Sequence, residues 1–306
     1  MRTAFIETLT EMAAKDPSLF LITGDLGFGV LVDFAARFPD QFLNVGVAEQ
    51  NMTGVATGLA MTGRKVFTYS IANFTTLRCL EQLRNCVAYH ELPVTAVAVG
   101  GGFSYGPLGF SHHATEDLAI LRALPGLAVC SPGDKWETRE LTRALIARGG
   151  PAYLRLDKMP ADDTVLEEEA FELGKPRVVR PGYDVAILAT GGVLGEALTA
   201  HEELKADGID ARVLSVHTLK PLDGGPIVDA ATQTRGIVTV EEHARSGGLA
   251  GAVAEVLMDA AAPIEGFVRL GLDDQFTTVV GSQPYLRQRY GVASGAIVAA
   301  ARGLLK

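Results

Sequence analysis

The sequence predicts an α/β protein with two domains, each a parallel sheet between two layers of helices. Three observations lead to this fold class. Short β-rich apolar runs alternate with helix-length segments along all 306 residues. Most of these runs are apolar at successive positions, as expected for strands that are buried on both faces. The hydrophobic fraction, 48%, is enough for two cores.

In chain order, six apolar runs predict the strands of a first sheet and four predict a second. The first six lie at 19–23, 42–47, 65–70, 94–100, 127–131 and 152–156. The other four lie at 184–190, 211–216, 236–242 and 267–271. The segment between the two sets is acidic, contains prolines and has no long periodic run. We therefore expect one domain at 1–160, a linker at 161–180 and a second domain at 181–306.

The composition argues against several classes of function. Charged residues make up 21% of the chain and the net charge is −9, with no basic stripe of the kind that nucleic-acid binding requires. No apolar run reaches the roughly 20 residues of a membrane-spanning helix. The N-terminal segment contains acids and no unbroken apolar stretch, unlike a signal peptide. We expect a cytoplasmic protein that binds neither nucleic acid nor a membrane.

Glu49 is an isolated acid in the otherwise uncharged stretch 44–52, where a predicted strand leads into a predicted helix. On that helix, positions 54, 56, 58 and 60 carry glycine or alanine. Because an interior glycine costs about 1 kcal/mol relative to alanine, close packing against another backbone should offset it. The neighbour would be either the sheet of the same domain or another subunit.

A glycine-rich loop that begins at Gly100 leads to two adjacent histidines, His112 and His113. It follows a predicted parallel strand, and open α/β sheets bind ligands at that end of their strands. Histidines in such a loop serve either a binding site or the structure of the loop, and the residues alone leave both roles open. The helix that follows is expected to be capped by Thr115.

Several segments resemble the C-terminal half of transketolase. In the first half of the chain they are NVGVAEQNMTGVATGLAMTG (44–63), FTYSIANFTTLRCLEQLRNCVAY (67–89) and SHHATEDLAILRALPGLAVCSPGD (111–134). DVAILATGG (184–192), VLSVHTLKPLD (213–223) and VTVEEHARSGGLAG (238–251) continue the match in the same order. The resemblance is greatest to the split form, in which this half is a separate polypeptide. It implies a pyrimidine-binding domain of a thiamine-diphosphate enzyme, followed by a transketolase C-terminal domain.

The resemblance implies a cofactor role for five residues. Glu49 would bond to the ring nitrogen of the aminopyrimidine and so promote the tautomer that deprotonates the thiazolium carbon. Phe74 would stack on the pyrimidine ring, and Ile71 and Leu77 would form an apolar wall beside it. Asp25 would lie near the cofactor and the substrate channel.

The resemblance also implies a group of substrate contacts. His112 would contact the reacting carbons and hydroxyls of the substrate, and His113 stands where many relatives have glutamine. Arg155 and Arg2 would hold the phosphate of a sugar phosphate, a task for which a charged, forked donor is suited. Arg78 would be either a further anion contact or a helix-surface charge paired with Glu81.

A partner subunit is implied by what this chain lacks. In the family, a GDG…N motif in a separate domain holds the diphosphate and its divalent metal. Gly24-Asp25-Leu26 followed by Asn51 has similar spacing without the last glycine, and it falls in the part that resembles the pyrimidine domain. We therefore expect no metal ligand here. An N-terminal transketolase subunit would supply the site for thiamine diphosphate and Mg²⁺ or Ca²⁺, in an α2β2 heterotetramer with a dimer of this chain at its core.

The expected reaction is transfer of a two-carbon ketol unit between sugar phosphates. Two departures leave alternatives open: Leu108 stands where transketolases usually have an acid that contacts a ketose hydroxyl, and Gly100 aligns with a histidine. One alternative is a decarboxylative acyloin synthase similar to deoxyxylulose-phosphate synthase. A second is the β-type subunit of a 2-oxo acid dehydrogenase, and a third is a non-catalytic scaffold subunit.

Overall fold

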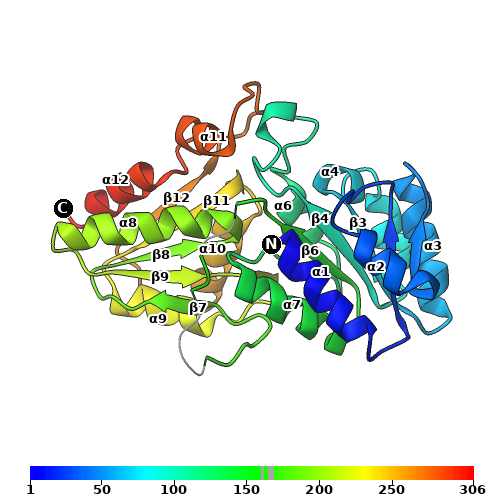
Figure 1. Ribbon diagram of the computed structural model, residues 1–306. Coiled ribbons are helices and arrows are strands. Elements are labelled where there is room, and N and C mark those ends of the chain that lie inside the picture. The colour runs from blue at the N-terminus through cyan, green and yellow to red at the C-terminus, as the bar shows by residue number, and fades with distance from the viewer. Residues whose placement is uncertain (160–161, 165–168) are drawn as a thin grey trace.

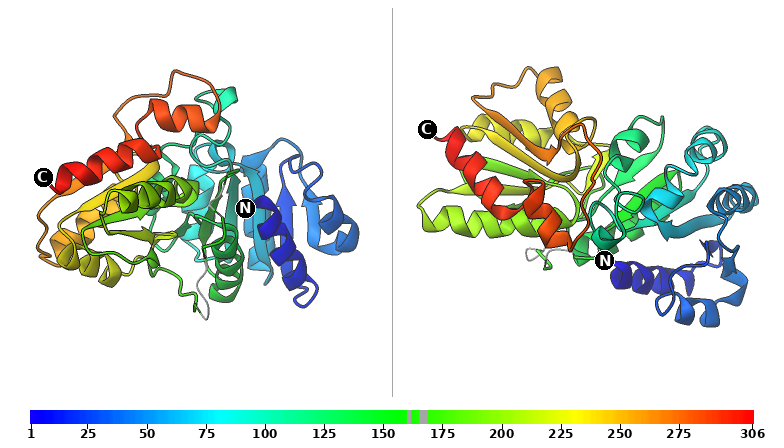
Figure 2. Two further views of the ribbon diagram at one scale, coloured as in Figure 1. Left: turned by 60° about the vertical axis from the view of Figure 1, so that its left-hand side comes forward. Right: turned by 90° about the horizontal axis from the view of Figure 1, so that it is seen from above.

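The computed structural model describes residues 1–159, 162–164 and 169–306. Two sheets lie side by side, the first formed mainly by the N-terminal half of the chain and the second by the C-terminal half (Figures 1 and 2). Positions 161 and 165–168 of the expected linker lie outside the described residues. The fold class predicted from the sequence is confirmed, with one antiparallel edge strand in each sheet.

The first sheet has seven strands in the order β10-β5-β6-β4-β3-β1-β2. They are β1 (Leu19–Thr23), β2 (Phe42–Asn44), β3 (Lys65–Ile71), β4 (Val94–Val99), β5 (Ala128–Cys130), β6 (Ala152–Leu156) and β10 (Thr218–Lys220). Neighbouring strands run parallel except β10, which is antiparallel to β5. The sequence did not predict β10, because the run TLK is short and is polar at two of its three positions.

Helices cover both faces of this sheet. They are α1 (Arg2–Ala13), α2 (Val32–Arg37), α3 (Glu49–Met61), α4 (Ala72–Thr75), α5 (Leu80–Gln82), α6 (Asp117–Arg122) and α7 (Lys135–Arg148), with short turns at Pro39–Gln41, Leu83–Ala88 and Gly106–Leu108. The expected cap at Thr115 is wrong. Helix α6 begins two residues later, and the Thr115 hydroxyl donates to the Glu116 carboxylate at 2.8 Å instead of to the helix.

The second sheet has five strands in the order β12-β11-β8-β9-β7. They are β7 (Arg177–Arg180), β8 (Val185–Ala189), β9 (Ala211–Ser215), β11 (Ile237–Ala244) and β12 (Phe267–Leu272). The helices are α8 (Leu194–Ala206), α9 (Gly225–Gln233), α10 (Leu249–Asp259), α11 (Gln283–Arg289) and α12 (Ser294–Leu304), with a short turn at Gly191–Val193. Strand β7, antiparallel to β9, lies inside the segment where we expected a linker.

The two sheets share a core. One apolar cluster contains Leu118 and Leu121 of α6 together with Leu219 of β10, Leu249 and Val253. Because β10 comes from the second half of the chain and pairs in the first sheet, the two halves are joined by backbone hydrogen bonds as well as by apolar contact. No helix in the part of the chain that the structure describes is long and apolar enough to cross a membrane.

Candidate functional site

The expected cofactor residues gather at the carboxyl ends of the strands of the first sheet. Asp25 follows β1, Glu49 begins α3 just after β2, and Ile71 ends β3. Phe74 lies on α4, the turn after β3, and residues 100–114, which we call the histidine loop, follow β4. Neighbouring parallel strands deliver these segments to one edge of the sheet, the place where open α/β sheets bind ligands.

Glu49 has a buried carboxylate with two partners. Its side chain is 1% exposed. The Ser70 hydroxyl donates to Oε1 at 3.1 Å, and the Arg78 guanidinium donates to Oε2 at 2.6 Å. A carboxylate in the first turn of a helix is also stabilised by the helix dipole. Of the two alternatives for Arg78, the pairing with Glu81 on a helix surface is wrong, because Arg78 lies in the turn between α4 and α5 and its partner is Glu49 of α3.

Phe74 and His112 lie against each other, with ring centroids 5.2 Å apart. Asn73 explains why their relative position is fixed. Its side-chain amide donates to the backbone carbonyls on both sides of His112, to Ser111 O at 3.2 Å and to His113 O at 2.8 Å. The residue next to Phe74 therefore holds the backbone around His112.

The arrangement of Glu49, Phe74 and Arg78 fits a pyrimidine ring. The Arg78 guanidinium lies over the Phe74 ring, 4.5 Å from its centroid, while it donates to Glu49. A guanidinium is planar, stacks on aromatic faces and donates N–H groups. A planar heterocycle could make the same two contacts, stacking on Phe74 and hydrogen-bonding to Glu49. The residues present therefore fit the pyrimidine half of thiamine diphosphate, provided that Arg78, which is 44% exposed, moves aside.

Asp25, Ile71 and Leu77 lie near this group. Asp25 has a left-handed backbone (φ 58°), and its carboxylate accepts a hydrogen bond of 3.0 Å from the side-chain amide of Asn44. Gly24, beside Asp25, is so near Glu49 that a Cβ there would lie 3.5 Å from the Glu49 Cγ. Leu77 is exposed next to Arg78, and Ile71 is half-buried at the end of β3.

His112 is partly exposed and is expected to be neutral at pH 7. Burial, with a smaller contribution from the charge of His113, lowers the pKa of the His112 ring. The Ser111 hydroxyl lies 3.0 Å from its Nδ1. A neutral imidazole that is reachable from solvent can donate or accept a hydrogen bond to a substrate hydroxyl.

His113, in contrast, does not fit the substrate contact expected for it. The ring is buried, with Nδ1 2.6 Å from the Thr277 hydroxyl and Nε2 3.1 Å from Gly106 O. Because a carbonyl only accepts, Nε2 carries the proton and Nδ1 accepts from Thr277. Burial lowers the pKa of His113, consistent with a neutral ring. Both nitrogens are used within the protein, so His113 supports the histidine loop.

Arg155 also does not fit its expected role. It is 1% exposed, and its Nε lies 3.1 Å from Asp117 Oδ2. Its NH2 group donates to Ala114 O at 2.8 Å and to Glu242 O at 3.0 Å. Arg155 therefore lies inside the contact between the two sheets, where a substrate phosphate could not reach it. Asp117 and Glu242 are distant in sequence, so no local pattern around Arg155 indicated this environment.

Lys158, which the sequence analysis missed, lies beside the ring of Tyr105, a neighbour of His112. The Lys158 ammonium is 4.1 Å from the centroid of the Tyr105 ring, and that ring is 6.2 Å from the ring of His112. Burial, and then the positive charge of Arg2, lower the pKa of Lys158. Arg2 is the first residue of α1. A basic residue just beyond the strand at 152–156 was the signal that could have revealed Lys158.

Five exposed apolar side chains flank the expected site residues along the chain. Each is within four residues, along the chain, of one of the expected site residues: Phe28, Val47, Leu77, Leu108 and Phe110. Gly54 and Gly58 of α3 are exposed as well, and nothing lies within 4 Å of where their Cβ atoms would be. The small residues of α3 therefore do not pack on their own sheet at these two positions. Large apolar surfaces of this kind are typical of protein contacts.

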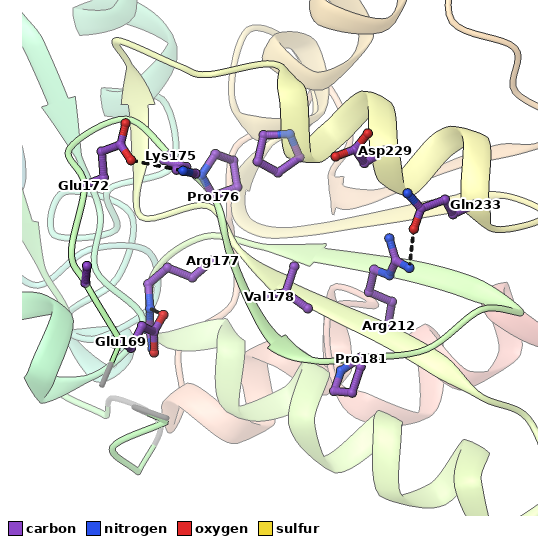
Figure 3. A pocket seen from close by; sticks show the side chains of 12 residues that line it. Glu169, Glu172, Lys175, Pro176, Arg177, Val178, Pro181, Arg212, Asp229 and Gln233 are labelled. Atoms are coloured by element: carbon purple, nitrogen blue, oxygen red, sulfur yellow. Dashed lines mark hydrogen bonds and ion pairs between the residues drawn. The ribbon is translucent and has the colours of Figure 1, made fainter. Parts of the chain in front are cut away.

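A cavity of about 530 Å³ lies away from this site, beside β7 and α9 (Figure 3). Its charged side chains are largely paired with one another. Lys175 and Glu172 are 3.0 Å apart, and Arg212 donates to Gln233 at 2.9 Å. None of the expected site residues lines it. Across the described ranges, no group of three or more His, Cys, Asp or Glu side chains is arranged to hold a metal ion.

Comparison with protein families gives two matches that together cover most of the chain. The family described as "Transketolase, pyrimidine binding domain" matches residues 1–162, and the one described as "Transketolase, C-terminal domain" matches residues 174–297. Among solved structures, one described as "Split gene transketolase, inactive beta4 tetramer" superposes with a TM-score of 0.88 at 36% identity, over 99% of this chain and 97% of that one.

Curated relatives give the same assignment. An apulose-4-phosphate transketolase subunit from Phocaeicola vulgatus is 38% identical over 95% of this chain and 93% of its own length. The 6-deoxy-6-sulfo-D-fructose transketolase subunit SqwH of Clostridium sp. is 38% identical over 98% of this chain and 93% of its own length. At 35% identity, the chain also matches 47% of the length of 1-deoxy-D-xylulose-5-phosphate synthase 1 of Geobacter sulfurreducens.

Proposed function

The chain belongs to the transketolase family, and we propose that it is the pyrimidine-binding subunit of a split enzyme that moves a two-carbon ketol unit between anionic sugars. One observation carries the proposal: Glu49, Phe74 and His112 meet at one sheet edge, in an arrangement that fits a planar heterocycle. Residues 1–160 would form the pyrimidine domain and 181–306 the C-terminal domain, with 161–180 between them.

Glu49 would share a proton with the bound cofactor. When bound, thiamine diphosphate supplies a carbanion nucleophile that accepts the ketol unit. In the proposed mechanism Glu49 Oε2, freed from Arg78, holds a proton at the pyrimidine ring nitrogen, and the Phe74 ring fixes the plane of that pyrimidine. Burial strengthens such a charged hydrogen bond, because the local dielectric is low and the carboxylate needs no rearrangement.

His112 would orient the sugar. The partly exposed ring lies 5.2 Å from the ring of Phe74, so a substrate attached beside the pyrimidine would lie within its reach. A neutral imidazole can donate to one hydroxyl and accept from another, according to its tautomer. Asn73 keeps this ring in place through the carbonyls of its neighbours.

We assign the anionic end of the substrate to Lys158 and Arg2 in place of Arg155. The support is that the Lys158 ammonium lies 4.1 Å from the centroid of the Tyr105 ring, which is 6.2 Å from that of His112, and that burial and then the charge of Arg2 lower the pKa of Lys158. The names of two relatives are consistent with this chemistry, since one acts on a sugar 4-phosphate and the other on a 6-sulfo sugar. An ammonium is a compact charge that does not require bidentate geometry and suits either anion.

The enzyme would need a second subunit. The exposed apolar side chains around Glu49 and His112 favour a covering partner, which we propose is an N-terminal transketolase subunit that holds the diphosphate and Mg²⁺ or Ca²⁺. The open glycine positions of α3 favour a dimer of this chain at the core of an α2β2 heterotetramer.

A decarboxylative acyloin synthase is the second candidate, and Leu108 is the observation that favours it. This apolar side chain is exposed at the tip of the histidine loop, four residues before His112, and cannot accept a hydrogen bond from a ketose hydroxyl. Leu108→Asp separates the two candidates. Faster transfer from an ordinary ketose phosphate would mean that leucine marks a different donor, whereas an unchanged rate would mean that the hydroxyl is bound elsewhere.

Reconstitution tests the main proposal. This chain alone is expected to bind thiamine diphosphate weakly and to show no ketol transfer. A mixture with an N-terminal transketolase subunit, thiamine diphosphate and Mg²⁺ should transfer the ketol unit of D-fructose 6-phosphate to an aldose phosphate. Full activity of the isolated chain would disprove the need for a partner. Decarboxylation of pyruvate by the mixture, without ketol transfer, would favour the second candidate.

A further inference from the structure

The histidine loop is held partly by the second domain. Its base is closed by two backbone hydrogen bonds of 3.0 Å between Gly102 and Ala114. Beside this base, the Phe103 N–H donates to the Glu242 Oε2 of β11 at 2.9 Å. Only glycine fits at position 102, because φ is +55° and a Cβ there would collide with the Glu242 carboxylate. The loop and Glu242 are therefore shaped for close contact.

A second contact lies beside His112. The Thr277 hydroxyl, in the segment between β12 and α11, is 2.6 Å from His113 Nδ1, and the other ring nitrogen of His113 lies 3.1 Å from Gly106 O. Gly281 N–H also donates to Gly106 O at 3.4 Å. In Figures 1 and 2, the orange segment before α11 runs beside the blue-green loop in both the front and the turned view.

We propose that Thr277 and Glu242 are positioning residues for the reaction, which hold the histidine loop so that His112 stays against Phe74. The inference rests on the proposed function, in which His112 contacts the substrate. It gives the second domain a task in catalysis, although neither residue touches the reacting atoms. Thr277 acts through His113, and Glu242 acts through the backbone of Phe103.

The hydrogen bonds of His113 explain why the Thr277 hydroxyl is needed at this position. The ring has to donate to Gly106 O through Nε2, which leaves the buried Nδ1 as an acceptor that only the Thr277 hydroxyl satisfies among the described residues. A buried acceptor that loses its donor is left without a hydrogen bond, which is unfavourable. Removal of this hydroxyl should therefore free the ring and the loop segment on either side of His113. A displacement of about 1 Å can reduce the rate of an oriented reaction about 100-fold.

Glu242 is held in turn by residues of its own domain. Its carboxylate accepts from Gln283 Nε2 at 2.9 Å and from the guanidinium of Arg287. Its backbone carbonyl accepts from Arg155 at 3.0 Å, and the same NH2 group of Arg155 donates to Ala114 O at the end of the loop. The buried arginine thus joins the loop base to β11.

Thr277→Val is the decisive variant, because it removes one hydroxyl and keeps the shape. Thr277→Ser keeps the hydroxyl and should rescue the loop. Thr239→Val is the matched control: Thr239 is also a buried threonine of the second domain, and among the described residues its hydroxyl has no hydrogen-bond partner. Hydrogen–deuterium exchange of the chain alone measures the loop without any need for activity.

In Thr277→Val, amides between residues 103 and 114 should exchange at least about tenfold faster, which corresponds to about 1.4 kcal/mol. Thr277→Ser and Thr239→Val should remain within about twofold of the wild type. Amides of β8 report global unfolding, so a rise confined to the loop identifies a local effect. Equal loop exchange in all four proteins would overturn the inference. So would a rise of the same size in β8.

Activity of the reconstituted complex, with D-fructose 6-phosphate as donor, completes the test. Thr277→Val should lower kcat about 10- to 100-fold with KM within about threefold, and Thr277→Ser should restore it. Glu242→Gln should lower kcat in the same way and release the base of the loop. A looser loop with unchanged kcat would overturn the positioning role while leaving the proposed function intact. An active His112→Ala complex would refute the proposed role of His112, and the inference with it.

Discussion

Two charged clusters of this chain pair an arginine with buried acids, and they differ in access to solvent. In the first, Arg78 is 44% exposed and bonds to Glu49 at the edge of the first sheet. In the second, Arg155 is 1% exposed and lies between Asp117 and the Glu242 backbone. An arginine that reaches solvent can exchange its partner for a ligand, whereas an enclosed one cannot leave without exposing unpaired charges. Accessibility, more than charge, therefore separates an arginine that can give way to a ligand from one that stays enclosed in the fold.

The largest expected effect is on catalysis, at the solvent-accessible cluster of Glu49 and Arg78. Glu49→Gln keeps the size of the side chain but removes its ability to share a proton. Exchange of the thiazolium proton in the reconstituted complex should slow by about 10²–10⁴-fold, the usual range for a positioned acid or base. Circular dichroism should show an intact fold. Glu81→Gln, an exposed acid nearby, is the control. Exchange at the wild-type rate in Glu49→Gln would remove Glu49 from the mechanism.

Loss of the arginine from the enclosed cluster should lower the stability of the fold. Arg155→Met leaves Asp117 as an uncompensated buried charge, so the free energy of unfolding should fall by about 3–5 kcal/mol. Arg78→Met should cost less than Arg155→Met, because Arg78 is 44% exposed and the Glu49 carboxylate keeps its hydrogen bond from Ser70. Urea denaturation of both variants measures the difference. If Arg155→Met were as stable as the wild type and raised only the KM of a phosphorylated sugar, our reassignment of Arg155 would be wrong.

Lys158 should bind the anionic group of the substrate. Lys158→Ala removes a charged hydrogen bond of about 1.5–3 kcal/mol, so the KM for D-fructose 6-phosphate should rise about 10- to 150-fold. The KM for unphosphorylated D-fructose should change little. Lys175→Ala, at an exposed lysine of the second domain, is the matched control. Equal losses for both sugars would show that Lys158 does not bind the anion.

A pH titration tests a third buried acid, which has no arginine partner within hydrogen-bond reach among the described residues. Glu241 accepts from the N–H groups of Leu249 and Ala250 at the start of α10, yet burial raises its pKa to about 7. A raised pKa means that the folded state binds the proton more tightly than the unfolded state does. Its contribution to stability is therefore complete below about pH 4.5 and lost as the pH rises to 7.

The comparison between wild type and Glu241→Gln isolates this effect. Between pH 4.5 and 7.5, the free energy of unfolding of the wild type should fall by about 1–3 kcal/mol relative to that of the variant. Denaturant titrations at several pH values give the two curves. Parallel curves would mean that Glu241 ionises in the folded state as readily as in the unfolded one.

The smallest effect concerns Arg78 itself. Because its guanidinium occupies the contacts that a pyrimidine would make, Arg78→Met should tighten thiamine diphosphate binding by the reconstituted complex, by up to about fivefold. Isothermal titration calorimetry measures the affinity. Weaker binding would instead show that Arg78 is a contact of the cofactor, the alternative that the sequence left open.

The sequence predicted the fold well where the signal was local. The ten predicted runs all form strands, and eight of them lie in the interior of a sheet, where strands covered on both faces are mostly apolar. Strands β7 and β10 escaped prediction for a physical reason. Each is a short, antiparallel edge strand, and RVVR and TLK are too polar or too short to show a pattern. Their place is decided by neighbours that are distant in the chain.

The site was predictable where the family resemblance supplied a role, and not where long-range packing decides. The structure brings Glu49, Phe74 and His112 together as the resemblance implied, although their roles stay predictions. The environments of Arg155 and His113 depend on Asp117, Glu242 and Thr277, which come from other elements and from the second domain. No local pattern could show that these two side chains are enclosed.

Strand β10 has a consequence for anyone who wishes to build chimaeras from this chain. A crossover between 23 and 218 separates β10 from strands of the first sheet, and a crossover between 220 and 237 separates β7, β8 and β9 from β11 and β12. No single junction between β1 and β12 leaves both sheets complete. Recombinants should therefore inherit the two halves from one parent, and the halves should evolve as one unit even where the gene for the rest of the enzyme is separate.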